Sequence, residues 1–137
     1  MDIEVIEQKL ESLRRCLQRV EEKCPASADI LARDFDSQDI LALNLSRAVQ
    51  LCVDIGAHII ANQRVSPPAT MGQTFDTLAE LGIMQPELAA RMKNAVGFRN
   101  IAVHNYEAIN WQIVYAIATR HLNDFKEFAR AIIEAVS

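Results

Sequence analysis

The residues between positions 99 and 106 carry most of the chemistry that this sequence offers. Arg99, Asn100, His104 and Tyr106 place a fixed cation, an amide, an imidazole and a phenol within eight residues. An arginine holds a phosphate through a rigid fork of donors, and a histidine transfers protons near neutral pH. Together these side chains suit the cleavage of a phosphodiester bond without a metal ion.

RNA provides its own nucleophile for such a reaction, the ribose 2′-hydroxyl. An enzyme must then provide a base, an acid for the leaving 5′-oxygen and a cation for the phosphate. His104 can act as the base or the acid, Arg99 can stabilise the phosphate, and Asn100 can orient a hydroxyl or the imidazole. The sequence therefore predicts Arg99, His104 and Asn100 as catalytic residues, with Tyr106 as a phosphate contact.

The spacing of these residues leaves their geometry open. Arg99 and His104 are five positions apart, which on a regular helix separates their side chains by a net angle of about 140°. They share a face only if the helix ends or loosens between them, and the polar residues before Asn110 make an end near His104 plausible. If the helix instead continues, the side chains of Arg99 and Tyr106 lie on nearly the same face, because they are seven positions apart. A complete site can therefore require two chains.

Composition limits the class of protein. With 137 residues, the chain is expected to form a single helical domain over positions 1–137. Half of the residues are hydrophobic and only 4 are glycine and 4 proline, which favours a globular helical fold. The net charge of −4 excludes a generic basic coat for nucleic acids, so RNA binding must depend on a local site.

Several other features point to a cytoplasmic protein without cofactors. Cys16, Cys24 and Cys52 match no disulfide framework or metal-ligand spacing. No signal peptide and no membrane-spanning run are expected, and no cofactor or metal is implied. Asp54 and His58 are only half of a metal site, although Asp54 could instead approach the motif from a central helix.

Apolar residues at helical spacing predict an all-α, up-down bundle of four main helices and a short extra one. The expected segments are Ile3 to Val20, ended by Pro25; Asp36 or Ser37 to about Ala61; Thr70 to Leu81, closed by Gly82; Pro86 to the motif; and Asn110 through Ile133, with a further helical turn around Ile30 to Arg33. The second segment is apolar on more than one face and should be central. The long apolar stripes exceed what a small bundle can bury, which favours a homodimer.

The remaining basic and aromatic residues have ordinary interpretations. Arg91 and Lys93 precede the motif and could guide a phosphate, although a solvated helix face is the default. Trp111 and the phenylalanines occur at helical spacing and are predicted to lie in the core rather than to stack on bases.

The motif resembles the R-x-x-x-x-H-x-Y signature of HEPN-domain ribonucleases. Over most of its length the chain is similar to the HepT-like toxins of toxin–antitoxin pairs, including the stretch from Asp54 to Ile60 and the placement of the motif before the last long helix. The asparagine after Arg99 also matches the polar residue that this family prefers.

The resemblance implies a HEPN-like bundle that forms a homodimer with its motif helices face to face. It also implies a metal-independent endoribonuclease that leaves a 2′,3′-cyclic phosphate on its RNA substrate. The implied partner is an MntA-like nucleotidyltransferase antitoxin that transfers AMP to Tyr106. Added phosphate charge beside Arg99 and His104 would block an RNA backbone.

A second hypothesis comes from a different class of function. The protein could be a non-catalytic helical module that uses the same arginine and histidine to bind a nucleotide or to dock a nucleotidyltransferase.

Overall fold

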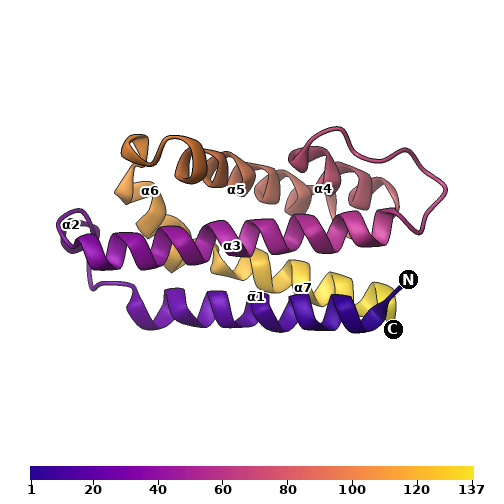
Figure 1. Cartoon of the computed structure of the whole chain (residues 1–137), viewed down its shortest axis with the longest axis horizontal. Coiled ribbons are helices and arrows are strands. Elements are labelled where there is room, and N and C mark those ends of the chain that lie inside the picture. Colours follow the sequence, from indigo (N-terminus) through magenta and orange to yellow (C-terminus); the bar gives the residue numbers. More distant parts are fainter.

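The computed structural model describes residues 1–137 and contains only helices and their connections (Figure 1). The elements in chain order are α1 (Ile3–Lys23), α2 (Ala28–Leu31), α3 (Phe35–Ile60), α4 (Met71–Glu80), α5 (Pro86–His104), the 3-10 turn η1 (Tyr106–Ala108), α6 (Trp111–Ala116), the π-helical segment η2 (Ile117–His121) and α7 (Leu122–Val136). This architecture confirms the predicted all-α bundle, whose main helical segments are α1, α3, α5 and α6–α7.

Helix α3 lies at the centre of the bundle, with α1 on one side and α4 and α5 on the other (Figure 1). Leu41, Leu45, Cys52 and Ile55 on this helix are fully buried, as expected for a helix that is apolar on several faces. Length and composition alone would also allow α3 to cross a membrane, but 56% of its most apolar window is buried inside the bundle. Its hydrophobicity is therefore explained by core packing.

Local signals set most helix boundaries where the sequence predicts them. Thr70 accepts a hydrogen bond from the backbone N–H of Gln73 and so caps α4. Gly82 follows α4 with a φ of 77°, a conformation that glycine adopts without strain. Pro86 is the first residue of α5, where its missing N–H costs nothing. Asn110 caps α6 through the N–H groups of Gln112 and Ile113.

Three expectations about the early helices are wrong in detail. Asp34, not Asp36 or Ser37, caps α3, because its carboxylate accepts hydrogen bonds from the N–H groups of both residues. The helical turn before it spans Ala28–Leu31 rather than Ile30 to Arg33. Phe35 is 76% exposed, because the first turn of α3 extends beyond the elements that could cover it. The other four phenylalanines are buried.

The last long helix is interrupted, which the sequence does not predict. Between α6 and α7, η2 forms one wider π-helical turn, and the Thr119 hydroxyl donates a hydrogen bond to the Tyr115 carbonyl beside it. The remainder of the segment packs inward through Val114, Phe125 and Phe128. Cys16, Cys24 and Cys52 are all free thiols.

Candidate functional site

The motif lies where α5 ends. The helix continues without a break through Arg99 and His104, and Asn105 then leaves the helical conformation, with a φ of −150° and a ψ of 63°. Tyr106 begins the next short turn, η1. Because the helix does not loosen between Arg99 and His104, these side chains leave it about 140° apart. A single chain therefore does not direct both side chains to the same face of α5.

Arg99 and His104 keep most of their hydrogen-bonding capacity. Arg99 is half-buried and donates one bond of 3.3 Å to the amide oxygen of Asn100, and it forms no ion pair with a carboxylate. His104 is exposed, and its imidazole makes no hydrogen bond in the chain, including none to the backbone carbonyls at the end of the helix. Both groups are therefore available to a ligand.

The other basic residues of α5 are already neutralised. Arg91 binds Asp124 at 2.8 Å and Glu127 at 3.1 Å, and Lys93 binds Asp76 at 2.9 Å. These ion pairs do not support the idea that Arg91 and Lys93 guide a phosphate. Along α5, a basic side chain without a carboxylate partner occurs only at the motif.

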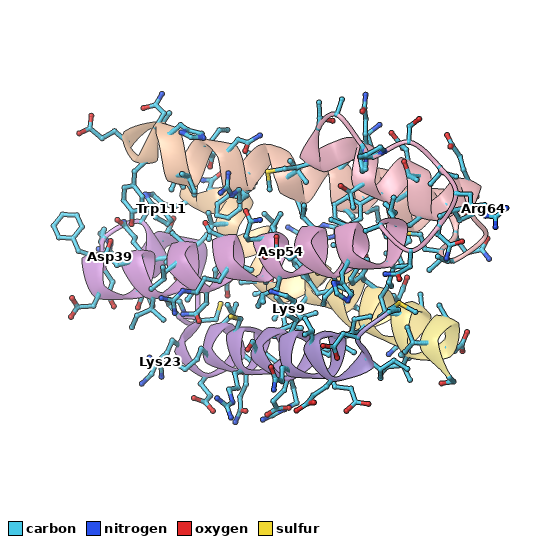
Figure 2. The ribbon with its side chains drawn as sticks, turned by 45° about the vertical axis from the view of Figure 1, so that its right-hand side comes forward. Lys9, Lys23, Asp39, Asp54, Arg64 and Trp111 are labelled. Carbon is cyan, nitrogen blue, oxygen red and sulfur yellow. The ribbon has the colours of Figure 1, made fainter.

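Tyr106 has a partner that sequence reasoning missed. Its hydroxyl donates a hydrogen bond of 2.6 Å to the Asp39 carboxylate on α3. Its ring packs edge to face against Trp111, with the ring centroids 5.8 Å apart. Figure 2 shows Asp39 near one end of α3, on the side where Trp111 lies. The two bonded residues are 67 positions apart, so no local sequence signal could have identified Asp39.

This environment affects the ionisation of the phenol. Partial burial and the hydrogen bond to the Asp39 carboxylate both raise the pKa of Tyr106 above its ordinary value, because each disfavours the phenolate. At neutral pH Tyr106 is therefore a neutral phenol, and its proton is directed toward a carboxylate that could accept it.

Asp54 and His58 lie outside the motif. The Asp54 carboxylate accepts a hydrogen bond from Gln50 and lies 3.8 Å from the Lys9 ammonium, so it does not contact the motif from the central helix. The His58 imidazole accepts a hydrogen bond from the backbone N–H of Asp2. No group of three histidine, cysteine or acidic side chains is arranged to hold a metal ion.

An apolar groove of about 510 Å³ lies beside the motif, between α5 and the α6–η2 segment. Ile101 and Ile113 line it and are 44% and 55% exposed. Aliphatic side chains that are this exposed and this close together are typical of a surface that another protein covers.

Comparisons with known proteins identify the family of this chain. The family model Ribonuclease HepT-like matches residues 6–132. The mRNA nuclease HepT of Shewanella oneidensis is 33% identical over 129 residues, covering 94% of this chain and 96% of that protein. The tRNA nuclease HepT of Aphanizomenon flos-aquae is 28% identical over 128 residues, covering 93% and 87% of the two chains.

Solved structures also match the fold over nearly the whole chain. A tri-AMPylated HEPN toxin of Shewanella oneidensis, solved in complex with its MNT antitoxin, superposes with a TM-score of 0.88 at 33% identity, covering 98% of this chain and 99% of that one. The family match spans nearly the whole chain, including every residue of the motif. This protein therefore belongs to the HepT-like ribonuclease family.

Proposed function

We propose that this protein is a metal-independent endoribonuclease toxin, cytoplasmic and neutralised by a nucleotidyltransferase antitoxin that adenylylates Tyr106. The observation that carries the proposal is a pair of groups at the end of α5, the Arg99 guanidinium, which has no carboxylate partner, and the His104 imidazole, which makes no hydrogen bond in the chain. They occur in a chain whose relatives are an mRNA nuclease and a tRNA nuclease.

The reaction follows from the chemistry of RNA. One imidazole removes the proton from a ribose 2′-hydroxyl, and the oxygen attacks the adjacent phosphorus. The bond from phosphorus to the 5′-oxygen breaks, an acid protonates that oxygen, and a 2′,3′-cyclic phosphate remains. Arg99 stabilises the extra negative charge on the phosphate, and Asn100 holds Arg99 in place through the bond between their side chains.

Two chains complete this site better than one. The angular separation of Arg99 and His104 on a continuous helix disfavours their convergence on one phosphate within a protomer. The exposed Ile101 and Ile113, which line the groove beside the motif, offer an apolar surface for a second copy. In a twofold pair, the arginine of one chain could face the histidine of the other, and two histidines could divide the base and acid roles.

Adenylylation of Tyr106 gives a chemical route to neutralisation. The phenolic oxygen attacks the α-phosphorus of ATP, pyrophosphate leaves, and the phenolic proton passes to a base. Asp39 already accepts a hydrogen bond from that proton. The AMP group would place a negative charge two residues from His104, where an RNA phosphate would otherwise bind. The Shewanella relative is itself a tri-AMPylated toxin in complex with an MNT antitoxin, which supports this route.

The decisive experiment measures RNA cleavage by the purified, unmodified protein in excess EDTA. We expect wild type to cleave and to leave cyclic-phosphate ends, and His104→Ala to lose at least about 100-fold in rate, the loss typical of an absent general acid or base. His58→Ala is the matched control, because it removes an imidazole far from the motif in sequence.

Two outcomes would contradict the proposal. Equal cleavage by wild type and His104→Ala would exclude this histidine as the catalyst. If wild type cleaves no RNA but His104→Ala weakens binding to ATP or to the nucleotidyltransferase in calorimetry, the protein is instead a non-catalytic binding module.

A further inference from the structure

A second groove, of about 730 Å³, runs between α1 and α3 and does not include the motif residues. Twelve residues line it, and eight of them are polar or charged, including Arg15, Arg19, Arg47, Asp39 and Asp54. Three of these are arginines. In a chain with a net charge of −4, three guanidinium groups on one groove are a local concentration of positive charge.

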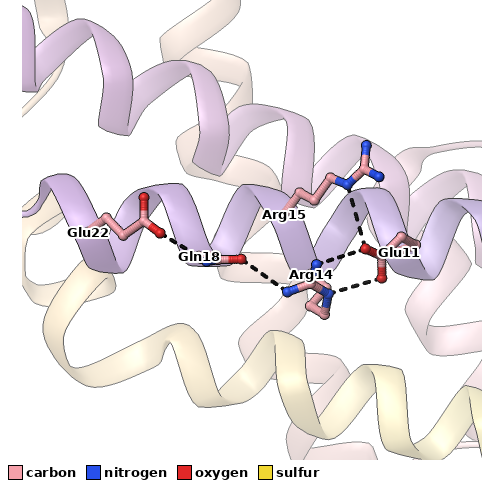
Figure 3. Close-up of polar contacts among 5 residues, drawn as sticks. All are labelled: Glu11, Arg14, Arg15, Gln18 and Glu22. Atoms are coloured by element: carbon pink, nitrogen blue, oxygen red, sulfur yellow. Dashed lines mark hydrogen bonds and ion pairs between the residues drawn. The ribbon is translucent and has the colours of Figure 1, made fainter.

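Of the three arginines, two form only long ion pairs with acidic neighbours, and the third forms none. Arg47 forms no ion pair or hydrogen bond within the chain. Arg15 shares the Glu11 carboxylate with Arg14 at a distance of 3.5 Å, and Arg19 lies 4.0 Å from Glu22. Figure 3 shows Arg15 on the side of α1 toward α3, and Arg14 on the side toward the yellow helix α7. Exposed contacts of this length are weak, so the guanidinium groups remain available.

The two carboxylates in the groove, by contrast, are occupied. Asp39 accepts the hydrogen bond from Tyr106, and Asp54 accepts one from Gln50 and lies near Lys9. Along α3 these two residues are fifteen positions apart, which corresponds to about 22 Å. The arginines lie between these two ends, on the facing surfaces of α1 and α3.

Asp39 connects this groove to the motif. It lines the groove and binds Tyr106, which is two residues from His104. A polymer that passes Arg99 and His104 could therefore continue across Asp39 into the space between α1 and α3. The groove contains no aromatic side chain for stacking on bases, so any recognition would involve the sugar–phosphate backbone.

We infer that this groove, defined by Arg15, Arg19 and Arg47, binds the phosphates of the RNA strand on one side of the cleaved bond. The inference rests on the proposed ribonuclease function and adds a second site to it. An apolar protein segment fits the groove less well, because only four of the twelve lining residues are hydrophobic. The groove makes substrate affinity depend on strand length, because a short RNA that fills only the motif would not reach the arginines.

The test uses a 2′-O-methylated RNA oligonucleotide, which lacks the nucleophile and so reports binding without cleavage. We expect the triple variant Arg15→Gln, Arg19→Gln, Arg47→Gln to bind it at least about tenfold more weakly. Three lost phosphate contacts should also reduce the slope of log affinity against log salt by about 2. With cleavable RNA, the loss should appear mainly in KM, because the groove does not hold the reacting phosphate.

Matched variants separate charge from folding. Arg14, Arg64 and Arg130 lie outside the groove, so their joint replacement by glutamine removes the same charge and should leave the affinity within about twofold. Replacement of the three groove arginines by lysine should retain most of the binding and the salt slope, because lysine also neutralises a phosphate. Thermal unfolding of each variant shows whether the bundle is intact.

Three results would overturn the inference. If wild type binds RNA and the glutamine variant binds equally well, the groove is not part of the RNA site, while the proposed function stands. If the variant keeps its RNA affinity but loses the nucleotidyltransferase, the groove is a protein-docking surface. If wild type neither binds nor cleaves any RNA, the proposed function fails as well.

Discussion

At the scale of single residues, the contact between Tyr106 and Asp39 distinguishes this tyrosine from a simple surface phenol. The bond of 2.6 Å fixes the direction of the hydroxyl, and Trp111 holds the ring from the side. The raised pKa of Tyr106 means that the free phenolate is scarce at neutral pH. Transfer of AMP to this oxygen would therefore benefit from a base that takes the proton during attack.

This contact gives a prediction for the modification. After incubation with the nucleotidyltransferase and ATP, intact mass should show AMP added to wild type and none on Tyr106→Phe. Asp39→Asn keeps a polar partner for the hydroxyl but cannot readily take its proton, so its initial rate of adenylylation should fall about tenfold or more. Tyr115→Phe is the control, because Tyr115 donates to the Ala26 carbonyl instead of a carboxylate. Unmodified wild type, or equal rates for Asp39→Asn and wild type, would contradict this role.

At the scale of elements, the approach of α4 to α3 depends on one glycine. A Cβ atom on Gly56 would lie 2.6 Å from Thr74 Cγ2 and 3.0 Å from Leu78 Cδ1. The Gly56→Ala change should therefore destabilise the fold by about 1–3 kcal/mol, despite the better helix propensity of alanine. Chemical denaturation measures this, with Gly72→Ala as the control, since its Cβ would make only ordinary contacts at 3.7 Å with Lys93. An unchanged or increased stability of Gly56→Ala would show that the two helices can separate at little cost.

The sequence predicts most of the helix boundaries correctly. Pro86, Gly82 and Thr70 act through their own backbone or their nearest neighbours, so their effects can be read locally. The sequence does not single out the cap of α3, because Asp34, Asp36 and Ser37 are all suitable caps and lie within one turn. The exposure of Phe35 depends on which elements lie over the first turn of α3, which helical spacing does not specify.

At the scale of the whole molecule, the sequence identifies the motif but not its surroundings. The types and order of Arg99, His104 and Tyr106 predict phosphodiester chemistry. Contacts over long sequence separations, such as Tyr106 with Asp39 and Arg91 with Asp124, appear only once the helices are packed. The sequence also leaves open whether one chain or two bring the guanidinium and the imidazole together.

The oligomeric state is therefore a prediction at this scale. Ile101→Glu with Ile113→Glu places charge on the apolar groove beside the motif, where both side chains are exposed in the single chain. The variant should remain helical, sediment as a monomer and lose most RNA cleavage. Ile133→Glu changes an equally exposed residue on α7 and should keep both the dimer and the activity. A dimeric double variant, or an active monomer, would contradict a shared site.

The π-helical turn η2 affects which face of the α6–α7 segment is buried. Val114, Ala118 and Leu122 are buried at two successive steps of four residues. In a regular helix, two such steps advance the third side chain by about 80° relative to the first. A π-helical turn rotates the chain less per residue and so reduces this drift. The π-helical turn thus keeps the buried side chains of α6 and α7 on one continuous face, which points into the bundle along its full length.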